Sequence, residues 1–76
     1  MSKLQELRKV KGISQSQLAK ITNINVRIIQ SYEQQERPVD NAGLDKLIPL
    51  ALALNCKISD LLENDDLKNK ALELGI

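Results

Sequence analysis

The feature of this chain that most restricts its fold is the segment at residues 14–33, SQSQLAKITNINVRIIQSYE. Its polar and apolar residues alternate with helical spacing, and the middle of the segment lacks a continuous helical pattern. Ser14 followed by Gln17 three residues later has the spacing of a capping box, so a helix should begin directly after Ser14. We expect this helix to run from Gln15 to Ile21 or Thr22, with three side chains facing inward: Leu18, Ala19 and Ile21.

The residues Thr22-Asn23-Ile24 are predicted to form a tight turn to a second helix. Asn23 tolerates a positive φ better than most residues, and Ile24 should fill the space between the two helices. Asn25 is the expected N-cap of the second helix, which should run from Val26 to about Gln34 with Ile28, Ile29 and Tyr32 on its inner side. A helix pair of this size is the unit that places one helix in the major groove of DNA.

Another helix is expected before this pair, from about Lys3 to Lys11. Ser2 has the right position to cap it, and Gly12 can take the left-handed conformation that ends a helix. The predicted inner stripe of this helix contains Leu4, Leu7 and either Val10 or Lys11.

Residues 34–41 are predicted to form a loop because they contain Pro38, and Asp40 or Asn41 can cap the next helix. That helix should span about Ala42 to Leu54, kinked or divided near Pro49. Its core stripe is predicted to contain Leu44, Leu47, Leu50 or Ala51, and Leu54. Ser59 should cap a fifth helix at about Asp60–Glu63, with Ile58, Leu61 and Leu62 inward.

The expected fold is therefore all-α, a compact five-helix domain at residues 1–63. The tail at residues 64–76 can form a short sixth helix. Leu67, Ala71 and Leu74 fall on one stripe of that helix, which can dock on its own domain, form a dimer interface or bind a protein partner. Aliphatic side chains must supply the core, since the chain has no Phe or Trp and one Tyr.

The charge of this chain is divided along its length, although its net charge is +1. Residues 1–30 contain six basic residues and one acidic residue, giving +5, whereas residues 31–76 carry −4. The basic part includes the helix pair. Such a distribution favours a protein that meets phosphate groups on one side.

Composition argues against several classes of protein. The chain has no histidine, one cysteine (Cys56) and no glycine-rich phosphate loop, so we expect neither an enzyme nor a metal site nor a cofactor. Cys56 is expected to be reduced and partly buried. No apolar run is long enough for a transmembrane helix, and no signal peptide is recognisable, so a cytoplasmic location is expected.

Several segments resemble the Cro/C1-type (XRE family) helix-turn-helix domains: LRKVKGISQSQLA, the turn TNI, NVRIIQSYE and LNCKISDLLE. The similarity covers about residues 4–63. Gln15 matches the polar residue that opens the first helix of the pair, and Ala19 matches the small residue where the two helices cross. Ile29 and Glu33 match the buried aliphatic and the closing acidic residue of the second helix. The chain departs from the family in having Asn23 where glycine is usual and Tyr32 where an aliphatic residue is usual.

The resemblance implies that the helix after Asn25 is a recognition helix whose residues read base edges: Asn25, Val26, Arg27, Gln30 and Ser31. Arg27 is the strongest candidate because a guanidinium can bridge guanine O6 and N7. Ser14 and Gln15 would hold phosphates, helped by free backbone amides, and Arg37 would be a further phosphate contact. The resemblance also implies a structural ion pair between Arg8 and Glu33.

The function expected from this resemblance is sequence-specific binding of double-stranded DNA. The chain would be a transcriptional regulator, expected to be a repressor, acting as a homodimer on a palindromic operator. The alternative is a protein-interaction module of the same fold, such as an antitoxin or an anti-repressor, with the C-terminal tail as the binding segment.

Overall fold

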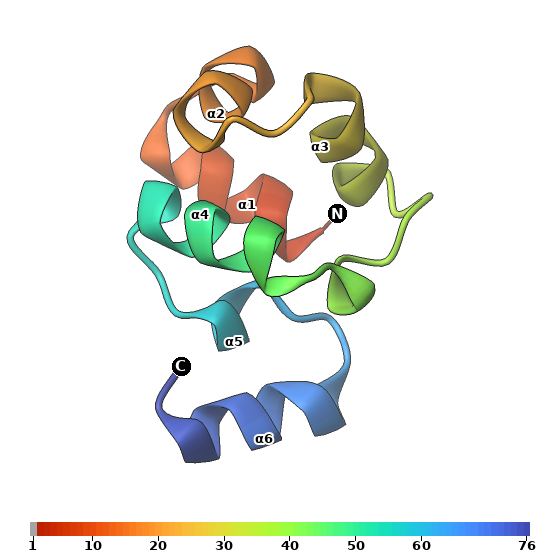
Figure 1. Cartoon of the computed structure of the whole chain (residues 1–76), viewed down its shortest axis with the longest axis vertical. Coiled ribbons are helices and arrows are strands. Elements are labelled where there is room, and N and C mark those ends of the chain that lie inside the picture. The colour runs from red at the N-terminus through yellow and green to blue at the C-terminus, as the bar shows by residue number, and fades with distance from the viewer. Residues whose placement is uncertain (1) are drawn as a thin grey trace.

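The computed structural model describes residues 2–76 and contains helices and loops throughout that range. The helices are α1 (Lys3–Lys11), α2 (Gln15–Thr22), α3 (Val26–Glu33), the 3₁₀ turn η1 (Val39–Asn41), α4 (Leu44–Leu54), α5 (Ile58–Leu61) and α6 (Asp65–Leu74). In Figure 1, α2 and α3 lie at one end of the long axis and α6 lies at the other. The all-helical class and the sixth helix are confirmed.

The ends of the first three helices follow from local chemistry, as the sequence predicts. Ser2, Ser14 and Asn25 are N-caps whose side-chain oxygens accept backbone N–H groups of the first turn. Gly12 ends α1 with φ 75° and Asn23 ends α2 with φ 58°, both in the left-handed region. Because these caps satisfy amides that have no partner within the helix, each one also fixes where its helix starts.

Two predictions of inward-facing residues in this region are wrong. Val10 is 87% exposed and Ile21 is 61% exposed, so neither belongs to the core. In α2 the buried side chains are Leu18 and Thr22, which are four residues apart and therefore share one face of the helix. Ile21 is three residues from Leu18 and therefore lies toward the edge of that face, where its side chain stays exposed.

The helix after the loop begins later than predicted. α4 starts at Leu44, and its N-cap is Gly43, so neither Asp40 nor Asn41 caps it. Asp40 instead accepts the backbone N–H of Glu63 at 2.7 Å, which holds the loop against the end of α5. Pro49 does not divide the helix, which continues through it. Proline removes one hydrogen bond, and the buried leucines on both sides of Pro49 hold the two halves in place.

The short α5 also begins earlier than predicted. Its N-cap is Lys57, whose backbone N–H donates to Asp60 Oδ2 at 3.0 Å. Ser59, the expected cap, lies inside the helix and is completely buried. Among residues 2–76 no group is within hydrogen-bond distance of its hydroxyl oxygen.

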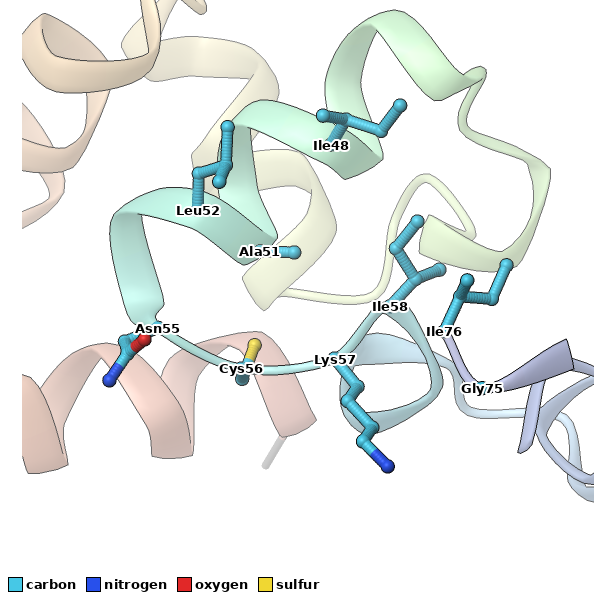
Figure 2. A pocket seen from close by; sticks show the side chains of 9 residues that line it. All are labelled: Ile48, Ala51, Leu52, Asn55, Cys56, Lys57, Ile58, Gly75 and Ile76. Carbon is cyan, nitrogen blue, oxygen red and sulfur yellow. The ribbon is translucent and has the colours of Figure 1, made fainter.

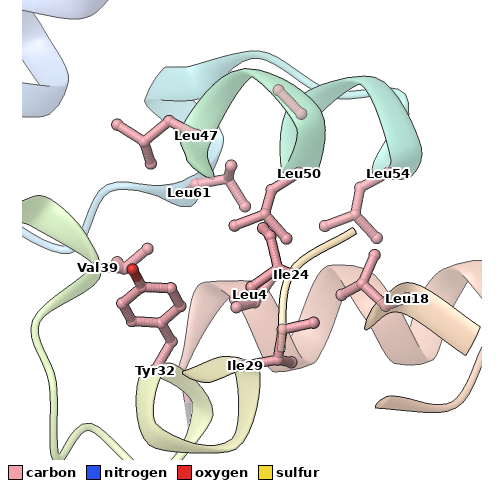
Figure 3. Close-up of a cluster of buried hydrophobic side chains, with 11 residues drawn as sticks. Leu4, Leu18, Ile24, Ile29, Tyr32, Val39, Leu47, Leu50, Leu54 and Leu61 are labelled. Carbon is pink, nitrogen blue, oxygen red and sulfur yellow. The ribbon is translucent and has the colours of Figure 1, made fainter. Parts of the chain in front are cut away.

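The core lies between α1, α2, α3, α4 and α5 and is made almost entirely of aliphatic side chains (Figure 3). Leu4, Leu18, Ile29, Leu50 and Leu61 are fully buried within it. Tyr32 and Ile24 also belong to this cluster, as predicted from the sequence. Leu44 does not, because it is 62% exposed on the opposite face of α4.

The C-terminal helix packs against α5 at the end of the molecule farthest from α2 and α3 (Figure 1). Ala71 and Leu62 are buried outside the main cluster. The backbone N–H of Ser59 donates to the carbonyl of Ile76 at 3.3 Å, which brings the chain end back to α5. None of the helices at residues 2–76 is long and apolar enough to span a membrane.

Candidate nucleic-acid interface

The first turn of α3 presents polar side chains to solvent. Asn25 and Arg27 are exposed, and Val26 between them is half-buried. Asn25 Oδ1 accepts the backbone N–H of Arg27 at 2.8 Å, which leaves the amide NH₂ of Asn25 free to donate. Arg27 forms no ion pair with any residue in the range 2–76. An unpaired guanidinium at the exposed start of a helix is available for an external acceptor.

The next turn of α3 continues the same surface. Gln30 and Ser31 are both half-buried, and each lies four residues after Val26 or Arg27 and therefore on the same side of the helix. Ser31 Oγ donates to the carbonyl of Arg27 at 2.9 Å. Val26, Arg27, Gln30 and Ser31 thus share one side of α3 and Asn25 is exposed at its N-cap, while Ile29 and Tyr32 on the other side hold the helix to the core.

The start of α2 forms a complete capping box, as predicted. Ser14 Oγ accepts the backbone N–H of Gln17 at 3.0 Å, and Gln17 Oε1 accepts that of Ser14 at 2.7 Å. The backbone amides of Gln15 and Ser16 have no hydrogen-bond acceptor among residues 2–76. Free amides at the positive end of a helix dipole are suited to an anionic oxygen such as a phosphate.

The side chain of Gln15, which the resemblance assigns to a phosphate contact, forms a hydrogen bond within the protein. Its Nε2 donates to Glu33 Oε1 at 3.0 Å, across the gap between α2 and α3. The bond uses one of the two N–H groups of the amide, and the other remains available. The sequence alone gives no signal for this link because Gln15 and Glu33 are 18 positions apart.

Glu33 is the centre of a buried polar network. Its side chain is 1% exposed and that of Arg8 is 11% exposed. Arg8 Nε donates to Glu33 Oε2 at 2.7 Å, and Arg8 Nη2 donates to Glu33 Oε1 at 3.0 Å. The third guanidinium nitrogen donates to the carbonyl of Ile13 at 2.9 Å. The structure therefore contains the Arg8–Glu33 ion pair, with the paired, bidentate geometry that favours arginine over lysine.

The network connects three helices and the chain between two of them. Arg8 belongs to α1, Gln15 to α2 and Glu33 to α3. The hydrogen bond to Glu33 raises the pKa of Arg8, against the opposing effect of burial. Arg8 therefore keeps its positive charge beside Glu33 at neutral pH.

Thr22 stabilises the turn between α2 and α3 through its side-chain hydroxyl, a role that the sequence does not indicate. Thr22 Oγ1 donates to the carbonyl of Leu18 at 2.7 Å and accepts the backbone N–H of Ile24 at 3.4 Å. Ile24 is buried, as expected for a residue that fills the space between the helices. A buried threonine followed by asparagine thus sets the angle at which α3 leaves α2.

Arg37 lies outside these helices, in the loop after α3. It is exposed, and it forms no ion pair with any other residue in the range 2–76. Its backbone N–H donates to the carbonyl of Ser31 at 3.2 Å, which ties the loop to the second turn of α3. The loop returns through Gln35, whose φ is 61°. Arg37 is therefore placed by the end of α3 rather than by α2.

The comparisons with known proteins agree with this geometry. The family model of the Cro/C1-type HTH DNA-binding domain matches residues 3–66, which include every residue of the candidate interface. The chain is 41% identical over 63 residues to "Control protein C.SmaI" of Serratia marcescens, covering 83% of this chain and 71% of that protein. No solved structure matches the chain at a significant level.

Proposed function

Because the chain belongs to the family of Cro/C1-type helix-turn-helix DNA-binding domains and is a DNA-binding transcriptional regulator, we propose that it is a sequence-specific repressor that binds double-stranded DNA as a homodimer. The observation that carries the proposal is the solvent-facing start of α3, where Asn25 and Arg27 are exposed, together with the free amides at the start of α2, the helix that packs against α3. This arrangement offers base-reading side chains and phosphate-binding groups on neighbouring helices.

Base readout is assigned to the side of α3 that faces solvent. Arg27 donates in bidentate fashion to guanine O6 and N7, and the free NH₂ of Asn25 donates to a base acceptor. Val26 contacts a thymine methyl group. Gln30 and Ser31, one turn further on, contact the following base or the adjacent phosphate.

Phosphate binding is assigned to the start of α2 and to the loop after α3. The hydroxyl of Ser14 and the amides of Gln15 and Ser16 approach one phosphate, and Arg37 approaches another. Gln15 can serve two purposes because its Nε2 has two N–H groups: one donates to Glu33 and the other to the phosphate. In this proposal Arg8 and Glu33 do not touch DNA, and they fix the position of α3 relative to α2.

A homodimer would place two copies of α3 about 34 Å apart, one turn of B-DNA, on a palindromic operator. A protein of this size bound over a promoter would exclude RNA polymerase by occupying the same DNA, which is the simplest mechanism of repression. In-vitro selection of bound duplexes followed by mobility-shift titration tests both the sequence preference and the spacing of half-sites.

The most direct test of base readout compares Arg27→Ala with Lys70→Ala on the selected duplex. Both variants remove one positive charge, but Lys70 lies on α6 and pairs with Asp66. Arg27→Ala should lose about 1–3 kcal/mol of discrimination at one G·C pair, whereas Lys70→Ala should keep the base preference of the wild type. An unchanged preference in Arg27→Ala would refute the role of this residue.

The salt dependence of binding tests the phosphate contacts separately. Each phosphate contact adds close to one unit to the slope of log K against log salt concentration. Arg37→Ala should lower the slope by about one unit and leave the base preference unchanged. A slope that is flat in the wild-type protein would contradict the assigned contacts.

A second candidate function is that of a protein-interaction module on the same fold, such as an antitoxin or an anti-repressor. It is favoured by α6, where Leu67, Leu72 and Leu74 remain partly or largely exposed after the helix has packed on α5. The same selection experiment discriminates between the two functions, because a module that binds a protein alone would enrich no DNA sequence.

A further inference from the structure

The segment at residues 34–43, here called the α3–α4 loop, contains the proposed phosphate contact Arg37. Its first half is tied to α3, because the carbonyl of Ser31 accepts the backbone N–H groups of Glu36 and Arg37 at 2.9 and 3.2 Å. Its second half forms the turn η1, where Val39 is buried in the core. Arg37 therefore lies between two attachment points, and its position depends on both of them.

The α3–α4 loop is separated from the domain by a cavity of about 180 Å³. Tyr32 and Glu63 line this cavity on the side of the domain. Arg37 and Asp40 line it on the side of the loop. Close packing holds most of a folded chain in place, so where packing is incomplete the position of the loop depends more on its hydrogen bonds.

One side chain of the loop reaches the end of α5 at the edge of this cavity. Asp40 Oδ1 accepts the backbone N–H of Glu63 at 2.7 Å, a distance typical of a carboxylate acceptor. The preceding residues Leu61 and Leu62 are buried, so the backbone at this point is firmly held. Glu63 Oε1 in turn accepts the backbone N–H of Lys3 at 2.7 Å. The bond from Asp40 therefore attaches the loop to α5 and, through Glu63, to the start of α1.

An aspartate three residues after an arginine could also serve to pair with that arginine. Asp40 forms no ion pair with Arg37, and Arg37 pairs with no other acidic residue in the part of the chain from 2 to 76. The carboxylate of Asp40 is directed at a backbone amide instead. It therefore holds the path of the chain and leaves the guanidinium of Arg37 available to an external anion.

We propose that Asp40 is a positioning residue for DNA binding, which holds the α3–α4 loop where Arg37 meets a phosphate. The inference rests on the proposed function, which assigns the phosphate contact to Arg37, and goes beyond it by naming the group that places this contact. A carboxylate repels a phosphate, so Asp40 acts through Arg37 and does not touch DNA itself. Without the bond to Glu63 the loop gains freedom, and fixing it again on binding costs conformational entropy.

The test measures the salt dependence of binding to a duplex with a single half-site. Asp40→Ala removes the acceptor, whereas Asp40→Asn keeps a side-chain oxygen that can accept the N–H of Glu63. Asp60→Ala is the matched control, because Asp60 Oδ2 accepts the backbone N–H of Lys57 at 3.0 Å and the change in charge is the same. Figure 2 shows Lys57 at the groove between α4 and the end of the chain, whose lining shares no residue with the cavity under the loop.

Asp40→Ala should lower the slope of log K against log salt concentration by about one unit, the decrease expected for Arg37→Ala, and keep the base preference. The two substitutions combined should lower the slope no further, because both remove the same contact. Asp40→Asn and Asp60→Ala should keep the slope of the wild type. A loss of stability alone would affect Asp40→Ala and Asp60→Ala alike and would leave both slopes unchanged.

Hydrogen exchange of the Arg37 amide, which donates to the carbonyl of Ser31, provides a readout without DNA. In Asp40→Ala this amide should exchange about tenfold faster than in the wild type, because opening of the loop no longer breaks the bond to Glu63. Asp40→Asn should exchange at a rate close to that of the wild type, and so should Asp60→Ala.

The outcomes separate this inference from the proposed function. An unchanged slope in Asp40→Ala, together with a lower slope in Arg37→Ala, overturns the inference alone. A further decrease in the combined variant gives Asp40 an effect of its own and also overturns the inference. An unchanged slope in Arg37→Ala overturns the phosphate contact in the proposed function, whereas faster exchange in Asp40→Ala would still uphold the role of Asp40 in holding the loop.

Discussion

At the scale of single residues, Glu33 determines how three helices meet. Its carboxylate is almost completely buried and accepts hydrogen bonds from Arg8 and Gln15. A buried charge that loses one partner keeps the cost of desolvation, so each bond in this set contributes to the position of α3. Gln15 is the uncharged residue among Arg8, Gln15 and Glu33. Its replacement by glutamate, which has a similar shape, tests how much the hydrogen bond to Glu33 contributes to stability.

Gln15→Glu is predicted to destabilise the protein at neutral pH by about 2 kcal/mol, because it replaces a donor to Glu33 with a second carboxylate. Two carboxylates at this distance raise the pKa of one of them in the folded state. A folded-state pKa that is raised above the unfolded value gives stability at low pH that is lost as the pH rises. The deficit relative to wild type should therefore shrink below about pH 5.

The matched control is Gln17→Glu on the same helix. Gln17 closes the capping box with Ser14, a position that glutamate fills as well as glutamine. Urea unfolding measures the free energy of unfolding at several pH values. Gln17→Glu should have a stability close to that of the wild type, whereas Gln15→Glu should be less stable at neutral pH. Equal stability of the two variants at neutral pH would contradict the role assigned to the Gln15–Glu33 bond.

At the scale of the element, the end of α3 sets the path of the chain toward Arg37. Gln34 is the C-cap of α3 with φ −82°, and the next residue, Gln35, reverses the chain with φ 61°. Glycine takes this left-handed conformation without penalty, whereas a residue with a long side chain pays a cost in conformational energy. The loop therefore contains a strained residue within two positions of a proposed phosphate contact.

Gln35→Gly is predicted to stabilise the protein by about 0.5 kcal/mol, because relief of the left-handed strain exceeds the added entropy of the unfolded chain. Gln34→Gly is the control, since that position is right-handed, and it should destabilise the protein by roughly 0.5–1 kcal/mol. Thermal unfolding should show a higher melting temperature than wild type for Gln35→Gly and a lower one for Gln34→Gly. A loss of stability in both variants would refute the prediction.

At the scale of the whole molecule, the features predictable from sequence are those decided within a few residues. The caps at Ser14 and Asn25 and the left-handed turn at Asn23 depend on local geometry, and the structure has all three. Val10 and Ile21 were misassigned because they lie at the edge of an apolar stripe, where the angle of the neighbouring helix decides burial. Helical spacing alone does not contain that angle.

The candidate site likewise contains features that local sequence predicts and features that depend on tertiary packing. The sequence places Arg27 on the outer side of the predicted recognition helix, because helical spacing puts it on the same side as Ser31 and away from the buried Ile29. The bond from Gln15 to Glu33 depends on how α2 and α3 cross, which is a tertiary feature with no signal in one sequence.

The domain boundary predicted at Glu63 leads to the last prediction. The polar network around Glu33 and the main core lie within residues 1–63, whereas α6 packs on α5 and contributes Ala71, which is buried outside the main core. A chain that ends at Glu63 should therefore still fold, with a loss of about 2 kcal/mol from the apolar side chains that are uncovered. Its preference for bases in a half-site should equal that of the full chain, since α1, α2 and α3 are intact.

Urea unfolding and mobility shifts on a single half-site measure these two quantities separately. The shorter chain should unfold cooperatively at a lower urea concentration and with a smaller m-value, because less surface becomes exposed. A shorter chain without cooperative unfolding would mean that α6 is part of the folding unit and that residues 1–63 are not an independent domain.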